Sequence, residues 1–405
     1  MPECLRTERI EVKPNRNLSK LCHLTKNLSN AANYEIRQLF FNKKPIPTYY
    51  KLCKMLQQKP EYKDLPGHTA QQTLKNLAKN WTSFIKSNQE FNKNPKKFFN
   101  KPRIPDYRKT NGEHLAIFTA NQVRLMENGY LKFPKLVNFA IKTRLSKETK
   151  IQQVRIIPKG VGYRIEIVYR RVYSTKRLQT NRKAAIDFGV VNIITMVDNI
   201  GSRPIVVKDD GKGLKSITQF YMKERAKLQK IYENQSIKSG GKLRKLIFMF
   251  ELRKLDQLHK ISKFIVKECV SRKIGTLVIG YNPKWKQSIR LGKKANQTFV
   301  NLPFNQLIEK IRYKAEEKGI QIELIDESYT SKCSFLDDKQ IRKLSKYKGK
   351  RVTRGLFQAY NGCSINADVN AAYNILVKSD PYAIPSRSAS GVGGYVVYPF
   401  CWKID

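Results

Sequence analysis

The chain is 405 residues long and carries 79 Lys and Arg against 32 Asp and Glu, which gives a formal net charge of +47. Hydrophobic residues make up 40% of it, so the composition excludes a disordered basic tail, and the length predicts two or three folding units. So large an excess of positive charge favours a polyanionic partner, and nucleic acid is the default one.

Several signals bear on cellular location. No run of about 18 apolar residues occurs, so no membrane-spanning helix is expected. The stretch from Met1 to Arg6 lacks the basic start and apolar core of a signal peptide. The seven cysteines, at positions 4, 22, 53, 269, 333, 363 and 401, are scattered and odd in number, so a disulfide framework is not expected. We therefore predict a reducing, cytoplasmic location, associated with the nucleoid if the host is a prokaryote.

The first half of the chain begins with a strand pattern and continues as helix. Residues 9–12 are expected as one short strand. A capping-box pattern at Thr69–Gln72 predicts the start of a helix. The apolar stripe of that helix recurs at steps of three and four residues and consists of Ala70, Leu74, Leu77, Trp81, Phe84 and Ile85.

A basic stretch rich in proline, residues 94–107, follows the helix and is expected as a linker or as an extended segment lying on phosphates. Strand patterns then fill residues 116–173, where 154–157 and 163–169 form a predicted hairpin. Residues 1–180 therefore look like a helical block inserted into a small β domain.

The second half alternates strands and helices. The expected elements are strands 183–188, 193–197 and 204–207, helices 215–235 and 243–273, strand 276–280, a helix between Pro303 and Gly319, strand 320–325 and helix 366–378. This order, βββαβαβα, is that of an RNase H-like fold, in which the first strand, a central strand and the final helix converge at one end of the sheet. The residues after 381, rich in Pro, Ser and Gly, are expected as a loose tail.

Two carboxylates stand out in a chain so short of acid. Asp187 lies in an otherwise apolar strand, and Asp368 lies in the first turn of the last helix. Hard divalent cations such as Mg²⁺ prefer carboxylate oxygens, and a pair of them stabilises phosphodiester displacement. Each residue also has a simpler explanation: Asp187 as a solvated strand end, and Asp368 as a favourable charge at a helix N-terminus.

A family resemblance decides between these readings. The stretches Ala185-Ile-Asp187-Phe-Gly189-Val-Val-Asn192, Tyr329-Thr-Ser331, Phe335-Leu-Asp337, Arg354-Gly-Leu356 and Ile365-Asn-Ala-Asp368-Val-Asn370 resemble TnpB, the transposon-encoded RNA-guided DNA nucleases related to type V CRISPR effectors. The resemblance covers roughly residues 183–378. It implies an α/β plus all-β protein: an RNase H-like (RuvC) nuclease domain with an N-terminal β-barrel wedge domain carrying a helical insertion. The implied boundaries are 1–12 and 100–180 for the wedge, 13–99 for the helical recognition domain, 181–378 for the nuclease domain and 379–405 for a flexible tail.

The resemblance assigns Asp187 and Asp368 to the first and third RuvC motifs. The second motif departs from the family, because Gly280 stands where a Glu usually ends the strand. The replacement we predict is Glu327, at the end of the following strand, as in branches with a relocated catalytic Glu. Strand parity separates Glu327 from Asp326, which is the weaker candidate. Asp187, Glu327 and Asp368 are thus the predicted catalytic and metal-binding residues, holding two Mg²⁺ ions, with Mn²⁺ as an alternative.

The region at about 328–365 also departs from the family. Many TnpB proteins carry two Cys-x-x-Cys pairs there, but this chain has only the isolated Cys333 and Cys363. Two thiols cannot supply four tetrahedral ligands, so no structural zinc is expected. We predict a degenerate zinc-finger or lid region held by contacts of Phe335, Leu336, Leu356 and Phe357.

Nucleic-acid contacts are predicted in three places. The two Lys-rich helices are expected to contact the backbone of guide RNA or heteroduplex, and their candidates are Lys223, Arg225, Lys227, Lys230, Arg253, Lys254 and Lys260. A loop after the central strand offers Trp285, Lys286 and Arg290 for a single strand, although a buried Trp285 is an equal reading. By the resemblance, the residues suited to a motif beside the target are Tyr49, Tyr50, Lys54, Gln71, Gln72 and Lys75.

The predicted function is an RNA-guided, Mg²⁺-dependent double-stranded DNA endonuclease, with a guide RNA from the transposon end as its partner and a DNA duplex as its target. A nuclease-inactive RNA-guided repressor is the main alternative, favoured by Gly280. A transposase-associated DNA-binding protein is the third. Retention of Asp187 and Asp368 argues for the enzyme, because clustered charge is costly to keep without a use.

Overall fold

The computed structural model describes residues 3–172, 181–209, 213–237, 240–282, 302–338, 340–384 and 398–403. The chain divides into two compact units, one spanning Pro2–Val172 and the other Tyr173–Asp405. This division lies close to the expected boundary at 180. Each unit is described below by itself.

The N-terminal unit contains two antiparallel sheets. One has the order β1-β7-β6-β2, built from β1 (Glu3–Val12), β7 (Tyr163–Val172), β6 (Ile151–Pro158) and β2 (Ala116–Thr119). The other joins β3 (Arg124–Leu125), β4 (Tyr130–Lys132) and β5 (Ala140–Lys142). The β6–β7 hairpin confirms the predicted one, whereas β1 is much longer than the expected 9–12 because its whole length pairs with β7. Closure of these strands into a barrel stays a prediction.

The helices of this unit are α1 (Arg16–Phe41), α2 (Tyr49–Leu56), α3 (Pro60–Lys63) and α4 (Gly67–Lys93), with short 3₁₀ turns at Pro95–Lys97, Ala120–Gln122 and Lys135–Val137. The predicted stripe of α4 is confirmed at Ala70, Leu74, Leu77 and Trp81, which are buried, whereas Phe84 and Ile85 are half-buried. The capping box at Thr69 was wrong. The helix begins two residues earlier, and Thr69 is buried with its hydroxyl bonded to Gln122.

One hydrophobic core joins the helices to the larger sheet. Leu18 and Leu28 of α1 and Trp81 of α4 belong to the same cluster as Phe118 of β2 and Ile165 of β7. The helical segment and the strands around it therefore form a single packing unit, although they are separate blocks along the sequence.

The C-terminal unit is built on a six-stranded sheet with the order β12-β11-β8-β9-β10-β16. Its strands are β8 (Lys183–Phe188), β9 (Asn192–Asp198), β10 (Ile205–Lys208), β11 (Thr276–Tyr281), β12 (Gln321–Asp326) and β16 (Phe400–Lys403). Strands β8, β9 and β10 form an antiparallel meander, and β11 and β12 follow parallel to β8. This is the RNase H-like strand order that the sequence predicted.

Strand β16 corrects the expectation of a loose tail over 379–405. Residues 400–403 pair in parallel with β10, and the Trp402 ring stacks on Phe264 at a centroid distance of 4.0 Å. A four-residue strand after a stretch rich in Gly and Ser carries too little pattern to be seen in the sequence. The rest of the expected tail lies partly outside the described residues, which stop at 384 and resume at 398.

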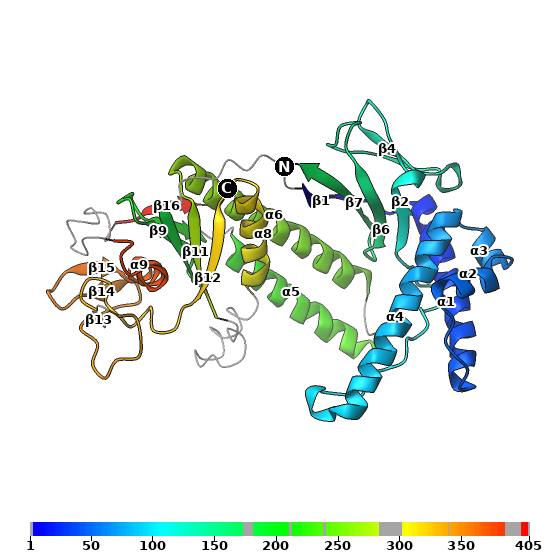
Figure 1. The fold of residues 1–405 in the computed structure, drawn as a ribbon, viewed down its shortest axis with the longest axis horizontal. Helices are drawn as coiled ribbons and strands as arrows, with labels where there is room; N and C mark the ends of the chain where they lie inside the picture. Colours follow the sequence, from blue (N-terminus) through cyan, green and yellow to red (C-terminus); the bar gives the residue numbers. More distant parts are fainter. Residues whose placement is uncertain are drawn as a thin grey trace. The chain divides into compact units, whose positions relative to one another are not determined.

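Helices cover both faces of this sheet: α9 (Ala367–Ser379) lies on one side, and α6 (Gly241–Ser271) and α8 (Phe304–Glu316) lie on the other (Figure 1). Helix α5 (Leu214–Asn234) packs along α6, and both Lys-rich segments are helical as predicted. The side chains of β8 alternate between two cores, because Ala184 and Ile186 pack with α6 and α8 while Ala185 packs with α9. A small sheet of β13 (Lys350–Arg351), β14 (Leu356–Gln358) and β15 (Ser364–Asn366) precedes α9.

Candidate active site

The three predicted acidic residues come from three different elements of the C-terminal unit. Asp187 has the parity of Ala185 on β8, which places it on the α9 side of the sheet. Asp368 lies in the first turn of α9, which begins there because the Asn366 side chain accepts hydrogen bonds from the Asp368 and Val369 amides. Glu327 follows β12 directly and shares the parity of Ile325, a side chain packed on the α9 side.

Electrostatics link these carboxylates. The pKa of Asp187 is raised well above its usual value, first by burial, then by the negative charge of Glu327, then by that of Asp368. The Arg351 guanidinium and the Phe188 amide act in the opposite direction and lower this pKa. All three carboxylate residues are half-buried. Asp187 is therefore the centre of an acidic group to which both other predicted residues contribute.

Two further side chains bind Asp368. Asn192 Nδ2 donates to one carboxylate oxygen at 2.6 Å, and Arg351 Nη2 contacts the other at 3.3 Å. Arg351 is itself oriented by the carbonyl of Arg354, to which its Nε donates at 3.0 Å. Sequence reasoning missed both residues as site components. Asn192 stood in the quoted motif beside Asp187, but Arg351 was one basic residue among many and carried no distinguishing signal.

The packing around Gly280 explains the departure of the second motif. Gly280 lies on β11 with the parity of Val278, which packs on the α9 side. A Cβ atom at this position would lie 2.5 Å from Ile375 Cδ1 and 3.4 Å from the Ile186 carbonyl oxygen. Ile375 of α9 is completely buried. A side chain at position 280 would therefore require the end of the Ile375 side chain to shift.

The other acids near the end of β12, Glu323 and Asp326, interact with residues outside the candidate site. Asp326 is exposed; partial burial tends to raise its pKa, but hydrogen bonds from Ser328 and the charge of Lys378 give a net lowering. Lys378 Nζ lies 3.4 Å from its carboxylate. Glu323 accepts a hydrogen bond from Ser379 at 2.9 Å. Among Glu323, Asp326 and Glu327, it is Glu327 whose charge raises the pKa of Asp187.

The acidic group is not a preformed metal cluster. Within the described part of the chain, no group of three or more His, Cys, Asp or Glu side chains is arranged to hold an ion. The donors nevertheless suit Mg²⁺ chemically, because they are carboxylates and the charges of Glu327 and Asp368 disfavour the ionised form of Asp187. A divalent cation would offset this repulsion, so the three residues fit the metal that the resemblance to TnpB implies.

The lid region is held to α9 by buried amides as well as by rings. Asn370 Oδ1 accepts from the Phe335 amide at 3.0 Å, and Asn374 Nδ2 donates to the Thr330 and Cys333 carbonyls at 2.8 and 2.7 Å. The Phe335 ring stacks on Tyr373 at 4.6 Å. Phe335 and Phe357 are buried as predicted, while Leu336 and Leu356 are half-buried. Sequence reasoning missed the two asparagines.

The two cysteines of this region lie in different settings. Cys333 is buried with its Sγ 3.6 Å from the Arg342 carbonyl oxygen, and Cys363 is half-buried. The absence of zinc stays a prediction.

The predicted nucleic-acid contacts fall into three groups. In the N-terminal unit, Tyr50 is 77% exposed with its ring 4.9 Å from that of Tyr49; Lys54 and Lys75 are exposed, and Gln71 and Gln72 are half-buried. On α5 and α6, Lys223, Lys227, Lys230, Arg253 and Lys260 are exposed and Arg225 is half-buried. Lys254 is a correction: it is 7% exposed, bonded to Glu251 and placed over the Phe250 ring, which does not suit a phosphate contact. Trp285, Lys286 and Arg290 lie outside the described residues.

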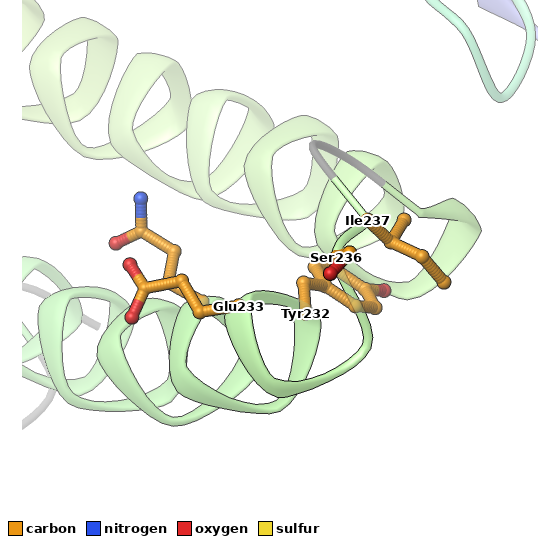
Figure 2. Close-up of a pocket in the computed structure, with 5 residues that line it drawn as sticks. Tyr232, Glu233, Ser236 and Ile237 are labelled. Atoms are coloured by element: carbon orange, nitrogen blue, oxygen red, sulfur yellow. The ribbon is translucent and has the colours of Figure 1, made fainter.

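A cavity of about 390 Å³ opens at the end of α5 and is lined by Gln229, Tyr232, Glu233, Ser236 and Ile237. Figure 2 shows Tyr232 and Glu233 on the last turn of the helix, with Ser236 and Ile237 on the turn that follows. The lining includes one carboxylate and none of the acidic group, so this cavity is not the candidate active site.

Among the described helices, none has the length and apolar composition of a membrane span.

The sheet order and the acidic group define a mixed α/β protein of the RNase H-like class. Comparisons with known proteins narrow that class. Residues 163–286 match the family model OrfB_IS605, described as a probable transposase, and residues 304–375 match that of the Cas12f1-like TNB domain. The matched segments are therefore similar to the OrfB_IS605 family and to the Cas12f1-like TNB domain.

Several relatives are similar to this chain at low identity. A TnpB-like protein of Methanocaldococcus jannaschii is 26% identical over 55% of this chain and 79% of its own length. A TnpB-like protein of Acidianus two-tailed virus is 25% identical over 92% of this chain and 86% of its own. The putative RNA-guided DNA endonuclease InsQ of Escherichia coli is 22% identical over 78% and 75%. A solved Cas12f1–sgRNA–target DNA complex covers 92% of this chain and 98% of its own at 12% identity, with a TM-score of 0.47.

Proposed function

We propose that this protein is an RNA-guided, Mg²⁺-dependent endonuclease that cuts double-stranded DNA with one RuvC-like site. The guide RNA comes from the end of the transposon that encodes the protein, and the N-terminal unit reads a short motif beside the target. The proposal is supported by the similarity to TnpB-like proteins and to a putative RNA-guided DNA endonuclease. It also accounts for the net charge of +47, which suits two nucleic-acid partners.

The observation that carries the proposal is the position of Asp187 at the end of the interior strand β8, on the α9 side of the sheet, where the charges of Glu327 and Asp368 help to raise its pKa. Half-buried like charges destabilise one another, and this cost is understandable at a site built to receive cations. Asp187, Glu327 and Asp368 would hold the metal. Bound there, a divalent pair supplies Lewis-acid stabilisation of the charge that develops as a phosphodiester is hydrolysed.

The chain's own residues prepare this site. Asn192 fixes the orientation of the Asp368 carboxylate through its 2.6 Å hydrogen bond. Arg351 balances the charge of Asp368 and favours the ionised form of Asp187. The amides of Asn370 and Asn374 hold the loop after Glu327 against α9. These are positioning roles, distinct from the metal-binding role of the three acids.

A second candidate is a nuclease-inactive RNA-guided repressor. It is favoured by Gly280, which removes the usual second-motif acid, and by the ion pair that occupies Asp368. A third candidate, a transposase-associated DNA-binding protein, is favoured by the description of the OrfB_IS605 model. It would join DNA ends without any RNA.

Two measurements separate these candidates. The first is sequencing of RNA that copurifies with the protein. A discrete species ending in a variable segment supports guiding, whereas heterogeneous cellular RNA contradicts it. The second is incubation of that complex with supercoiled plasmid carrying the matching target and Mg²⁺. Nicked or linear plasmid supports the nuclease, protection without cleavage supports the repressor, and strand transfer without RNA supports the transposase.

A further inference from the structure

A second surface, in the N-terminal unit, involves the segment of residues 98–115. In this fully described segment no helix or strand forms. Its backbone is bonded by polar side chains of α1: Lys26 Nζ donates to the Thr110 carbonyl at 2.7 Å, and Asn30 makes two bonds of 2.9 Å with the Arg108 backbone. The segment is therefore fixed along the helix. Sequence reasoning expected part of it as a linker or as a segment lying on phosphates.

The same tethering continues toward the end of α1. Asn33 and Arg37 both donate to the Pro105 carbonyl, at 3.1 and 2.9 Å. The bonded positions on the helix, 26, 30, 33 and 37, are three or four residues apart and so lie on one face. Residue numbers rise along α1 as they fall along the segment, so the two run antiparallel. With its backbone turned to the helix, the segment presents exposed side chains at Tyr107, Arg108 and Lys109.

Exposed aromatic rings gather beside this seam. Tyr34 is 53%, Phe41 61% and Tyr107 41% exposed. The Arg37 guanidinium carbon lies 4.9 Å from the centroid of the Tyr107 ring and 5.7 Å from that of Phe41. Because Arg37 is anchored by Pro105, it is a fixed cation between two exposed rings. We name Tyr34, Arg37, Phe41 and Tyr107 the stacking surface.

The surroundings of the stacking surface are basic. The exposed cations on the neighbouring segments are Lys43, Lys44, Lys101, Arg103, Arg108 and Lys109. The acids on these segments are Asp106, which is exposed, Glu113, which accepts hydrogen bonds from Ser19 and Tyr163, and Glu35, which pairs with Lys59. A surface that binds another protein does not require so many cations around its aromatic rings. A single-stranded nucleic acid does, because its bases stack on rings and arginine planes while its phosphates contact the surrounding cations.

We propose that the stacking surface binds unpaired RNA. Bases stack on the rings of Tyr34, Phe41 and Tyr107, and the surrounding lysines and arginines contact the phosphates. RNA is favoured over single-stranded DNA by Asp106, whose exposed carboxylate accepts a hydrogen bond from the Tyr107 amide through Oδ1 at 2.8 Å and can accept one from a ribose 2′-hydroxyl through its other oxygen. This contact deepens the proposed function, on which it rests for an RNA partner, by naming where unpaired RNA is held; it requires neither the metal site nor a matching target.

The first test measures binding of a short fluorescent oligouridine to the full-length chain carrying Asp187→Asn, without Mg²⁺, so that failure of the nuclease proposal leaves this test intact. We expect Tyr107→Ala to weaken binding roughly tenfold, because stacking contributes that much per base. Tyr107→Phe keeps the ring and should bind like the parent. Tyr130→Ala removes an equally exposed ring, 40% exposed on β4, and should change nothing.

Salt dependence distinguishes stacking from charge. Removing a ring leaves the slope of log Kd against log salt unchanged, whereas Arg103→Ala reduces that slope by about one phosphate contact. The proposal is overturned if Tyr107→Ala binds oligouridine like the parent, if Tyr130→Ala weakens binding as much, or if the parent binds a single-stranded DNA of the same length as tightly as it binds oligouridine.

Cross-linking gives an independent result. RNA containing 4-thiouridine, irradiated on the Asp187→Asn protein and mapped by mass spectrometry, should cross-link to peptides that carry Tyr34, Phe41 or Tyr107. Cross-links confined to other peptides contradict the proposal even if the variants change affinity.

Discussion

Ile375 of α9 occupies the space that a side chain at Gly280 of β11 would need: a Cβ atom there would lie 2.5 Å from Ile375 Cδ1. This contact links position 280, where the resemblance leads us to expect a Glu, to the packing of the helix that carries Asp368. Any side chain placed at position 280 therefore affects the core around Ile375.

The contact predicts that Gly280→Ala destabilises the protein by about 1–3 kcal/mol, because a well-packed core must shift to admit the methyl group. Ile375→Val removes the clashing atom and should recover part of that loss in the double variant, beyond the sum of the single effects. Thermal and denaturant unfolding of the four proteins measures this coupling. Strict additivity of the two changes would contradict the proposed clash.

The proposed role of Glu327 as the second acid makes a separate prediction. Asp187→Asn, Glu327→Gln and Asp368→Asn should each lower the cleavage rate at least about a hundredfold, since each removes a metal-binding charge worth several kcal/mol. Asp326→Asn is the matched control, because Asp326 precedes Glu327 but pairs with Lys378, and it should retain activity.

Guide-RNA binding should survive all four substitutions, and this can be checked by RNA content after purification. Cleavage lost in Asp326→Asn and kept in Glu327→Gln would reassign the second acid. Adding Gly280→Glu to Glu327→Gln should not restore cleavage, because Ile375 blocks the space.

The Arg351–Asp368 ion pair predicts competition with metal. Arg351→Ala removes a cation that contacts Asp368 and favours ionised Asp187, so the site becomes more negative. At mildly alkaline pH we expect Mn²⁺ to bind about two- to fivefold more tightly, the scale of a partly exposed ion pair. The pKa of Asp187 should also rise, so metal affinity should fall sooner on acidification.

Calorimetric Mn²⁺ titration at several pH values, without nucleic acid, measures both effects. Lys350→Ala, the neighbouring exposed cation on β13, is the control for a general loss of positive charge. Weaker Mn²⁺ binding by Arg351→Ala than by Lys350→Ala would show that Arg351 supports the metal site rather than competing for it.

The sequence predicted the parts of the fold that depend on regular patterns. The apolar strands 183–188 and 276–280 and the amphipathic helices gave the strand order, because that order follows from the succession of elements. Strand β16 and the full length of β1 were not predicted, because they depend on pairing with strands distant in the sequence rather than on a local pattern. Thr69 shows the same limit: its capping motif was overruled by a buried hydrogen bond with Gln122.

The candidate site was predictable only where a motif carried it. Asp187 and Asp368 stood in recognisable stretches, and strand parity selected Glu327 over Asp326. Arg351, Asn370 and Asn374 act through contacts between separate segments of the chain. Such contacts cannot be predicted from the spacing of residues in the sequence. Lys254 failed for a related reason, because composition cannot distinguish an exposed lysine from one bonded along its own helix to Glu251.

The buried amide of Asn374 predicts a positioning effect. Asn374→Ala leaves the Thr330 carbonyl without its side-chain donor and removes one of the two amide donors to the Cys333 carbonyl, the other being Asn370, and we expect a loss of about 1–3 kcal/mol in stability. Because the loop it holds follows Glu327, cleavage should fall while metal affinity changes less than in Glu327→Gln. Unfolding, Mn²⁺ titration and cleavage rates of the two variants test this. Unchanged cleavage in a folded Asn374→Ala protein would remove the residue from the site.

His114 predicts how acid affects the N-terminal unit. Burial, then the charge of Arg108, lowers the pKa of its imidazole from 6.5 to about 4. Between these values the unfolded chain binds a proton that the folded chain does not, so stability is complete above 6.5 and is lost as the pH falls towards 4. The loss is at most about 3 kcal/mol, since one pKa unit corresponds to about 1.4 kcal/mol.

Replacing His114 with Gln should therefore flatten the pH dependence of unfolding over that interval, whatever it does to stability at neutral pH. His68→Gln, at an exposed position on α4, is the matched control and should leave the profile unchanged. Chemical denaturation from neutral to acidic pH, followed on the full-length chain, gives the slope for each protein. An equal slope in the parent and in His114→Gln would mean that the imidazole titrates alike in the folded and unfolded states, against the burial described here.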